Sequence, residues 1–511
     1  MKQNRKWICI ACILAQLLML AACGNAESAE TQNTDAAQQT ETQPVETKDP
    51  YDPELPEKDF EGYNFTFAVR GVEGVGSAWD NTDIVAAEVT GEPLNEAVYE
   101  RNTYIEDTYN VKIGVMWCGD TSVALTGSNM SKAVSQLILS GEDSMDAILT
   151  SPYDTVGYTL NKYLLDLETF EYLNLSQPWW DQNANANLSF GGKIYFTTGE
   201  ITIIDNKCTY LTIFSKDLVE MYELDNPYNA VREGTWSLDK VISDAAIVTT
   251  DVNGDGVMDY NDRIGYVYWQ DTAFALIHGA GNTYGKINEK GEPELTFYTE
   301  RMISTWDKMI GLAKSELSFG MKPGDKVLSD LGAVMNNSVE GVYLTKLENQ
   351  TMLYAYTTPH GILNLRECEA DFGILPTPKL NPEQDRYYST AHGYGTALMS
   401  VPVTASDTSR TGFILEAFCA KSAQLVTPAF YDVTLTGKTI RDEDSAEMLD
   451  IIFANKVYDI GYFFMWGDLS NKVMNAWNSQ NENLTSIYQS AETKALTDVE
   501  AAVEIFTSLE S

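Results

Sequence analysis

The chain has few basic residues and very few histidines. Its 511 residues include 34 Lys and Arg against 74 Asp and Glu, which gives a formal net charge of −40, and only three His. An acidic surface of this kind repels phosphate backbones, so nucleic acid is not expected as a partner. It suits cation binding, although a solvated acidic surface is the commoner meaning of such a composition. Because no His-Glu-x-x-His pattern occurs, a zinc site built from histidines is not expected.

The common local signatures of catalysis are also missing. There is no Gly-x-Ser-x-Gly elbow, no P-loop and no Rossmann fingerprint. We therefore expect a protein that is not an enzyme. A glycosidase stays open as an alternative, because its two carboxylates leave little trace in a sequence.

Long apolar runs are absent except at the start of the chain. Three of the first six residues are basic, and Trp7 to Leu20 is then apolar apart from Gln16. At about 14 residues this run is short for a membrane-spanning helix, but it matches the apolar core of a secretory signal peptide. Residues 1–22 are therefore predicted to be a signal peptide, and their loss would take the formal charge to about −43.

The end of this segment reads Leu20-Ala21-Ala22-Cys23. It resembles the bacterial lipobox, which implies that the Cys23 thiol receives a diacylglycerol and becomes the N-terminus, with palmitate a typical acyl chain. Multiple acyl chains anchor a protein durably. We expect a lipoprotein held on the extracytoplasmic face of the cell membrane by lipid alone. The alternative is an ordinary secreted protein with a chance Cys at its cleavage site.

The remaining cysteines form no framework. Four lie far apart in the rest of the chain and include no Cys-x-x-Cys pair, so buried free thiols are expected, with one or two disulfides left open. They are Cys118, Cys208, Cys368 and Cys419.

Composition changes near residue 60. Residues 23–59 are rich in Ala, Thr, Gln, Glu and Pro and poor in large apolar residues, so we expect a disordered tether. From Phe60 onward, period-two runs alternate with amphipathic segments, which favours an α/β layered fold with at least two lobes. The expected elements are strands at 64–70, 111–117 and 146–150 and helices at 94–109 and 131–140.

Several later segments, in order, resemble the extracellular solute-binding proteins, family 1, of ABC importers. The resemblance covers nearly the whole chain after the tether and rests on ERNTYIEDTYNVKIGV, SQLILSGEDSMDAILTSPYD, GGKIYFTTGE, LTIFSKDLVEMYELDNP, WSLDKVI, ADFGILPTPKL and LMSVPVTASDTSRTGFILEAFCAKS. It implies a two-lobe, periplasmic-binding-protein-like fold of type II. Residues 60–205 with 335–395 would form lobe 1, and 206–334 with 396–511 would form lobe 2.

The same resemblance implies a function. A sugar or oligosaccharide would be captured in a cleft between the lobes by hinge closure and delivered to ABC permease subunits. Aromatic rings cover the apolar faces of sugars and carboxylates accept their hydroxyls, so an aromatic residue beside a carboxylate after a strand is the pattern to seek. The resemblance implies that Tyr153, Asp154, Tyr343 and Trp466 lie near ligand-contacting positions of the family. Trp79 and Asp80 are added because this aromatic–carboxylate pair follows the first expected strand.

Residues 251–262, DVNGDGVMDYND, match the spacing of an EF-hand calcium loop. A helix is expected before the loop at 238–248 and a strand after it, so the loop would be isolated and its Ca²⁺ structural. The alternative is an acidic turn without metal. The candidate ligands are Asp251, Asn253, Asp255, the carbonyl of Val257, Asp259 and Asp262.

Three other functions stay open. A surface enzyme acting on polysaccharide would need a pair of cleft carboxylates, one with a raised pKa. A dockerin-bearing scaffold component would need two calcium loops near a terminus, whereas one internal loop is present. A binding protein for another solute, such as a peptide, is compatible with the same lobes, because a fold does not fix its ligand.

Overall fold

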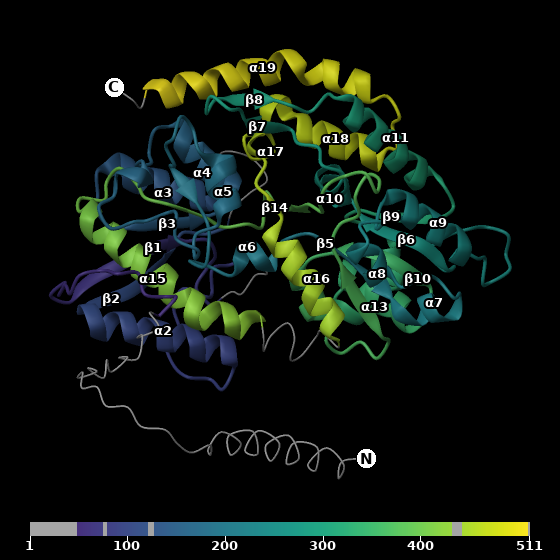
Figure 1. Ribbon diagram of the computed structural model, residues 1–511, viewed down its shortest axis with the longest axis horizontal. Helices are drawn as coiled ribbons and strands as arrows, with labels where there is room; N and C mark the ends of the chain where they lie inside the picture. Colours follow the sequence, from purple (N-terminus) through teal and green to yellow (C-terminus); the bar gives the residue numbers. More distant parts are fainter. Residues whose placement is uncertain (1–48, 75–78, 121–126, 432–441, 509–511) are drawn as a thin grey trace, which may run out of the picture. The chain divides into compact units, whose positions relative to one another are not determined.

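The computed structural model describes residues 49–74, 79–120, 127–431 and 442–508. The predictions for the signal peptide, for Cys23 and for most of the tether therefore lie outside the described residues. Two five-stranded sheets organise the rest, and both belong to the unit Pro50–Ser511 (Figure 1).

The first sheet has the order β2-β1-β3-β13-β4 and defines lobe 1. β1 pairs in parallel with β2 and β3, while β13 runs antiparallel to β3 and β4. Parallel pairs need a crossover helix, and the amphipathic segments that follow β1 and β2 supply it. The bounds are β1 Tyr63–Val69, β2 Val111–Trp117, β3 Ala147–Thr150, β4 Phe196–Thr197 and β13 Leu398–Ser400.

The second sheet has the order β11-β5-β10-β6-β9 and defines lobe 2. β5 is antiparallel to β10 and β11, and β6 is parallel to β10 and β9. Two short sheets, β12-β14 and β7-β8, and several isolated β-bridges add to the pairing among the described residues. The bounds are β5 Leu211–Ser215, β6 Ile264–Trp269, β9 Ser318–Met321, β10 Met352–Thr357, β11 Phe372–Leu375, β7 Gly285–Ile287, β8 Pro293–Leu295, β12 Ser389–Thr390 and β14 Lys456–Val457.

Local sequence explains where the helices begin and end. Pro93 opens α2, where its missing N–H costs nothing, and Asn110 ends it in a left-handed conformation. Ser128 caps α3 by accepting the N–H of Ser131, and Gly141 ends it. The lobe 1 helices are α2 Pro93–Tyr109, α3 Asn129–Ser140, α4 Pro152–Leu160, α5 Gln182–Leu188 and α15 Thr408–Pro428.

The remaining helices belong mainly to lobe 2 and to the segments beside it. They are α6 Ile204–Lys207, α7 Lys216–Met221, α8 Pro227–Arg232, α9 Leu238–Val248, α10 Thr272–Gly279, α11 Glu300–Lys314, α12 Lys326–Asp330, α13 Val339–Glu348, α14 Pro359–Asn364, α16 Glu443–Ala454, α17 Ile460–Phe463, α18 Leu469–Asn478 and α19 Leu484–Ser508. Short 3-10 helices lie at Leu167–Thr169, Gly332–Met335 and Trp466–Asp468.

The chain passes between the sheets in two fully described segments. Residues 198–210 lead from β4 to β5, and residues 391–397 return from β12 to β13. The expected lobe boundaries are therefore wrong for two stretches. β10 and β11, expected in lobe 1, pair within the second sheet, and β13, expected in lobe 2, pairs within the first. A period-two pattern identifies a strand but not its partner, so the sequence could not place these strands.

The C-terminal helix α19 contacts both lobes. Near its start, Tyr488 stacks on Tyr298 with ring centroids 4.6 Å apart. Near its end, Phe506 stacks on Phe190 of lobe 1 at 3.5 Å. Figure 1 shows α19 running over the β7-β8 hairpin and alongside α18. Helix α19, which has 25 residues, therefore packs against both lobes on one side.

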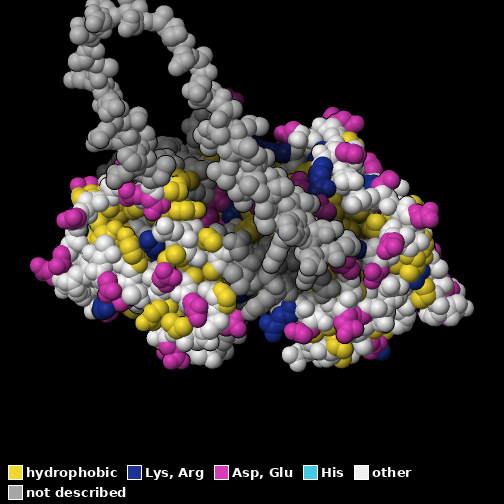
Figure 2. Space-filling view, turned by 60° about the horizontal axis from the view of Figure 1, so that its bottom comes forward, with side chains coloured by type: hydrophobic (Ala, Val, Ile, Leu, Met, Phe, Trp, Pro, Cys, Tyr) yellow, Lys and Arg dark blue, Asp and Glu magenta, His cyan; other side chains and the backbone are white. Residues whose placement is uncertain are grey.

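The buried and exposed residues fit the expectations from composition. No helix in the described part of the chain has the length and apolarity needed to cross a bilayer. Cys118, Cys208 and Cys419 carry buried free thiols, and Cys368 is buried as well. Asp and Glu side chains are spread over the face seen in Figure 2, with fewer Lys and Arg between them.

Candidate functional site

A cavity of about 770 Å³ is lined by residues of both lobes and of the 391–397 crossing segment. Lobe 1 contributes Trp79 and Tyr153, and lobe 2 supplies most of the remaining wall. Eight of the lining residues are aromatic: Trp79, Tyr153, Trp269, Phe274, Tyr343, Tyr356, Tyr394 and Tyr462. Enclosed, mostly apolar cavities with a few polar groups are the usual form of a small-molecule site.

Trp79 is held in the wall by a buried arginine. Arg70, which follows β1, donates from Nε to the carbonyl of Trp79 (2.6 Å) and from Nη1 to the carbonyl of Tyr394 (2.8 Å). The Trp79 ring lies between two imidazoles, with centroids 5.1 Å from His360 and 5.9 Å from His392. Arg70 thus joins the loop after β1 to the crossing segment and fixes one aromatic wall.

Tyr153 reaches the cavity from the first turn of α4. Ser151 caps this helix by accepting the N–H of Asp154. The Tyr153 ring meets that of Tyr462 from lobe 2 edge to face, at 6.3 Å. A Cβ at position 393 would come within 2.7 Å of the Tyr153 hydroxyl, so only Gly393 allows this approach.

Asp271 is an acidic group at the end of the cavity wall formed by β6. It follows Trp269, the last residue of β6, and precedes α10 without capping that helix through its side chain. Burial raises the pKa of Asp271 to about 6. The Nε2 atom of His392 lies 4.0 Å from its carboxylate, and burial together with the charge of Arg70 lowers the pKa of His392 to about 3.

The structure brings three of the six predicted ligand residues together. Trp79, Tyr153 and Tyr343 line the cavity, although they come from three distant parts of the sequence. The Tyr343 side chain is almost fully buried, and its hydroxyl has no hydrogen-bond partner among the described residues.

The other three predicted residues are buried elsewhere. Asp154 accepts hydrogen bonds from the Ser128 hydroxyl at 2.9 Å and from the Thr150 hydroxyl at 3.4 Å, so it braces the helix ends of lobe 1. Asp80 packs against Gly71. Trp466 is 1% exposed and its ring fills the space beside Gly285, where a Cβ would come within 2.2 Å of it. None of the three lines the cavity.

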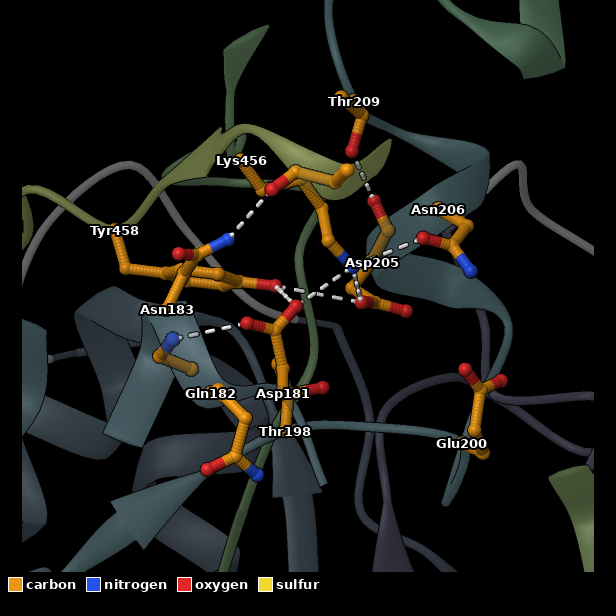
Figure 3. A network of polar contacts seen from close by, with 12 residues as sticks. Asp181, Gln182, Asn183, Thr198, Glu200, Asp205, Asn206, Thr209, Lys456 and Tyr458 are labelled. Carbon is orange, nitrogen blue, oxygen red and sulfur yellow. Dashed lines mark hydrogen bonds and ion pairs between the residues drawn. The ribbon is translucent and has the colours of Figure 1, made fainter. Parts of the chain in front are cut away.

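A buried ion-pair network connects the lobes beside the crossing segments (Figure 3). The ammonium of Lys456, in β14, donates to Asp181 of lobe 1 (2.9 Å), to Asp205 and to the amide oxygen of Asn206 (2.9 Å). The hydroxyl of Tyr458 donates to Asp181 at 2.8 Å. Burial would raise the pKa of Asp181, but the ammonium of Lys456 and further hydrogen bonds hold it below its ordinary value.

The 251–262 loop forms a tight acidic turn. The carboxylate of Asp251 accepts the N–H groups of Gly256 (2.9 Å) and Gly254 (2.6 Å), which hold its pKa below the ordinary value. Both glycines have positive φ, as a sharp turn demands. The buried carboxylate of Asp262 accepts the N–H groups of Val252 and Asp259. Across the described residues, no group of three or more His, Cys, Asp or Glu is arranged to hold a metal ion.

The sequence analysis missed several cavity residues. Trp269 is the last residue of β6, and Asp271 follows it two residues later, so the pattern of an aromatic residue and a carboxylate at the end of a strand also marks them. Tyr356 lies within β10 and Tyr462 within α17, where no local signal distinguishes a cavity residue from a core residue.

Comparison with known proteins places the fold. No protein-family model and no curated protein matches the chain. Among solved structures, an ABC substrate-binding protein from Listeria monocytogenes in complex with cycloalternan is 13% identical, with a TM-score of 0.51 over 85% of this chain and 99% of that one. A sugar transporter from Rhizobium etli in an open conformation is 14% identical, with a TM-score of 0.52 over 87% of this chain and 99% of that one. This protein therefore has the two-lobed α/β fold of substrate-binding proteins, as the sequence predicted.

Proposed function

We propose that this protein belongs to family 1 of the extracellular solute-binding proteins and binds a sugar or oligosaccharide for an ABC importer. The observation that carries the proposal is the aromatic-lined cavity with walls from both lobes. Closure of two lobes around a ligand is an established form of domain motion. The closed form would be recognised by permease subunits. The two solved structures described above, which share this fold, are named as an ABC substrate-binding protein and a sugar transporter.

The chemistry of the cavity suits a saccharide. Rings such as Trp79 and Tyr153 can cover the C–H faces of sugar units, and the carboxylates of Asp271 and Glu340 can accept sugar hydroxyls. A dissociation constant in the micromolar range, about −8 kcal/mol, is a reasonable expectation, because the importer must be able to take the ligand away. Titration calorimetry followed by chromatography of the recovered ligand tests the proposal, because a binding protein returns the saccharide intact.

One observation favours a second function, the hydrolysis of polysaccharide. Two carboxylates, Asp271 and Glu340, line the cavity, and burial raises the pKa of Asp271 to about 6. A glycosidase uses such a pair, with the raised carboxyl as general acid. The same chromatography separates the two functions, since shortened saccharide would identify an enzyme.

We also propose lipid anchoring at Cys23, on the extracytoplasmic face of the cell membrane. The support is the signal-like segment that ends in Leu20-Ala21-Ala22-Cys23. Cys23→Ala should abolish incorporation of labelled fatty acid and release the protein from the membrane into the medium. Cys118→Ala is the matched control and should retain both the label and the membrane fraction. Equal labelling of wild type and Cys23→Ala would contradict the anchor.

Calcium at the 251–262 loop is a further proposal. The turn around Asp251 and the two glycines fits the first half of an EF-hand loop, whereas Asp262 would have to release two backbone N–H groups to reach an ion. Ca²⁺ should then raise the melting temperature by mass action, and excess EDTA should lower it. Asp251→Ala with Asp255→Ala should remove this response. If excess EDTA leaves the melting temperature of the wild type unchanged, the loop does not bind Ca²⁺ and is an ordinary turn.

A further inference from the structure

The charged groups of the cavity are all of one sign. Among the lining residues, which all lie in the described part of the chain, there are two carboxylates, Asp271 and Glu340, and there is no Lys or Arg. Arg70 lies behind the Trp79 wall, where its three nitrogen donors are engaged by the carbonyls of Trp79, Tyr394 and Gly395. Its charge is therefore committed to holding the wall together, and the cavity offers a ligand only negative charge and aromatic faces.

Tyrosine rings line the same cavity as the carboxylate of Asp271. They are Tyr153 from lobe 1 and Tyr356 and Tyr462. The Asp271 side chain is 24% exposed and lines the cavity. A carboxylate and aromatic rings in one cavity are a favourable combination for a cation, since a positive charge is attracted both to the carboxylate and to the face of a ring.

Among the described residues that line the cavity, no Lys or Arg neutralises this carboxylate. The group facing it from the crossing segment is His392, at 4.0 Å, and burial together with the charge of Arg70 keeps that imidazole unprotonated near neutral pH. The tyrosines that face it from α4, β10 and α17 keep their protons, because burial raises the pKa of each hydroxyl. Partial burial disfavours the charged form of Asp271, and a nearby cation favours it, so a cationic ligand gains more here than a neutral one.

We propose that the cleft selects saccharides that carry a protonated amino group, which pairs with the Asp271 carboxylate, and that it rejects anionic saccharides. This inference rests on the proposed binding of carbohydrate and names the class of carbohydrate. Hydroxyl groups of a neutral saccharide can donate to Asp271, but they leave its charge in place. Uronic acid units would meet two carboxylates and no compensating cation.

Titration calorimetry with four saccharides tests the selection. The probes are β-1,4-linked oligomers of glucosamine, N-acetylglucosamine, glucose and glucuronic acid, each with its monosaccharide. At pH 6.5, where Asp271 is mostly ionised and glucosamine amines are substantially protonated, we expect the glucosamine probe to bind at least about tenfold more tightly than the two neutral probes, which is one decade in Kd. The glucuronic acid probe should not bind measurably.

Asp271→Asn should bring the glucosamine and glucose affinities to within about twofold of each other while leaving the melting temperature nearly unchanged. Asp385→Asn is the matched control, because its carboxylate is 76% exposed and lies outside the cavity. The preference should also depend on pH. Asp271 becomes protonated as the pH falls through about 6, so the amine affinity should drop by about tenfold between pH 6.5 and pH 4.5, while the glucose affinity stays constant.

The outcomes separate this inference from the proposed function. Equal binding of amine and neutral probes, or an amine preference that survives Asp271→Asn, would overturn the charge selection and leave the sugar-binding function in place. If the glucosamine oligomer binds tightly but is recovered in shortened form, the preference for amino saccharides would stand and the transport function would be overturned. If none of the four probes binds at millimolar concentration, both the charge selection and the proposed binding of carbohydrate would be overturned.

Discussion

Lys456→Met is expected to lower the free energy of unfolding by about 3–5 kcal/mol at pH 7, because it removes the cation from a buried ion-pair network. The Lys456 side chain is 6% exposed, and the Asp205 and Asp181 carboxylates that it pairs are 2% and 10% exposed. Without the ammonium, these two acids would remain buried close to each other. Thermal or urea unfolding measures the loss.

The effect should depend on pH in a defined direction. Its charged partners hold the pKa of Lys456 above the ordinary lysine value, so the lysine contributes fully at neutral pH and loses its contribution only in strong alkali. The pKa of Asp181 is held down, so its share is lost as the pH falls below about 4, the pKa of an unfolded Asp. The deficit of the variant should therefore be present from pH 5 to 9 and shrink in acid.

Two controls isolate the network. Lys322→Met removes an exposed lysine for which no ion pair is found among the described residues, and it should cost less than about 0.5 kcal/mol. Adding Asp205→Asn to Lys456→Met should recover part of the loss, since one uncompensated charge disappears. If Lys456→Met unfolds at the same temperature as the wild type, the network shown in Figure 3 does not stabilise the protein.

Trp466→Ala should destabilise the protein by about 3–5 kcal/mol, the range for deleting a large buried aromatic side chain. The sequence suggested that Trp466 contacts ligand, but the structure places it in the core, beside Gly285 and with its ring centroid 6.0 Å from that of Phe464. Saccharide affinity should change little at a temperature where the variant is still folded. Unfolding curves and titration calorimetry measure the two effects separately.

Trp79→Ala is the matched comparison and should show the opposite pattern. Trp79 lines the cavity and is only partly buried. Truncating an aromatic anchor of a binding site commonly costs at least about 2 kcal/mol of affinity, about thirtyfold in Kd. The melting temperature should fall much less than for Trp466→Ala. If Trp466→Ala keeps its stability but loses saccharide binding, Trp466 contacts the ligand and the assignment to the core is wrong.

The sequence predicted the local elements well because their signals are local. The helix expected at 94–109 is found at Pro93–Tyr109, and the strand expected at 111–117 is found at those residues. The helix expected at 238–248 is also found with those bounds. Apolar periodicity, Pro at a helix start and Gly or Asn at a helix end are properties of neighbouring residues.

The pairing of strands and the direction of side chains were harder to predict from the sequence. β10 and β5 are separated by more than 130 residues, and no periodicity reveals that they adjoin. Tyr153 and Asp154 are neighbours in sequence, yet only Tyr153 lines the cavity, since successive residues of a helix point in different directions. Three of the six predicted ligand residues therefore lie outside the cavity, while Trp79, Tyr153 and Tyr343 line it.

The central claim is that two lobes close on a saccharide that is bound and not consumed. The most direct measurement is titration calorimetry of the full chain with an oligosaccharide panel, followed by chromatography of the saccharide recovered from the complex. We predict one saturable site with micromolar Kd, loss of binding in Trp79→Ala, and recovery of the saccharide at its original length. Recovery of shortened saccharide, or binding of peptides with no response to any saccharide, would contradict the account.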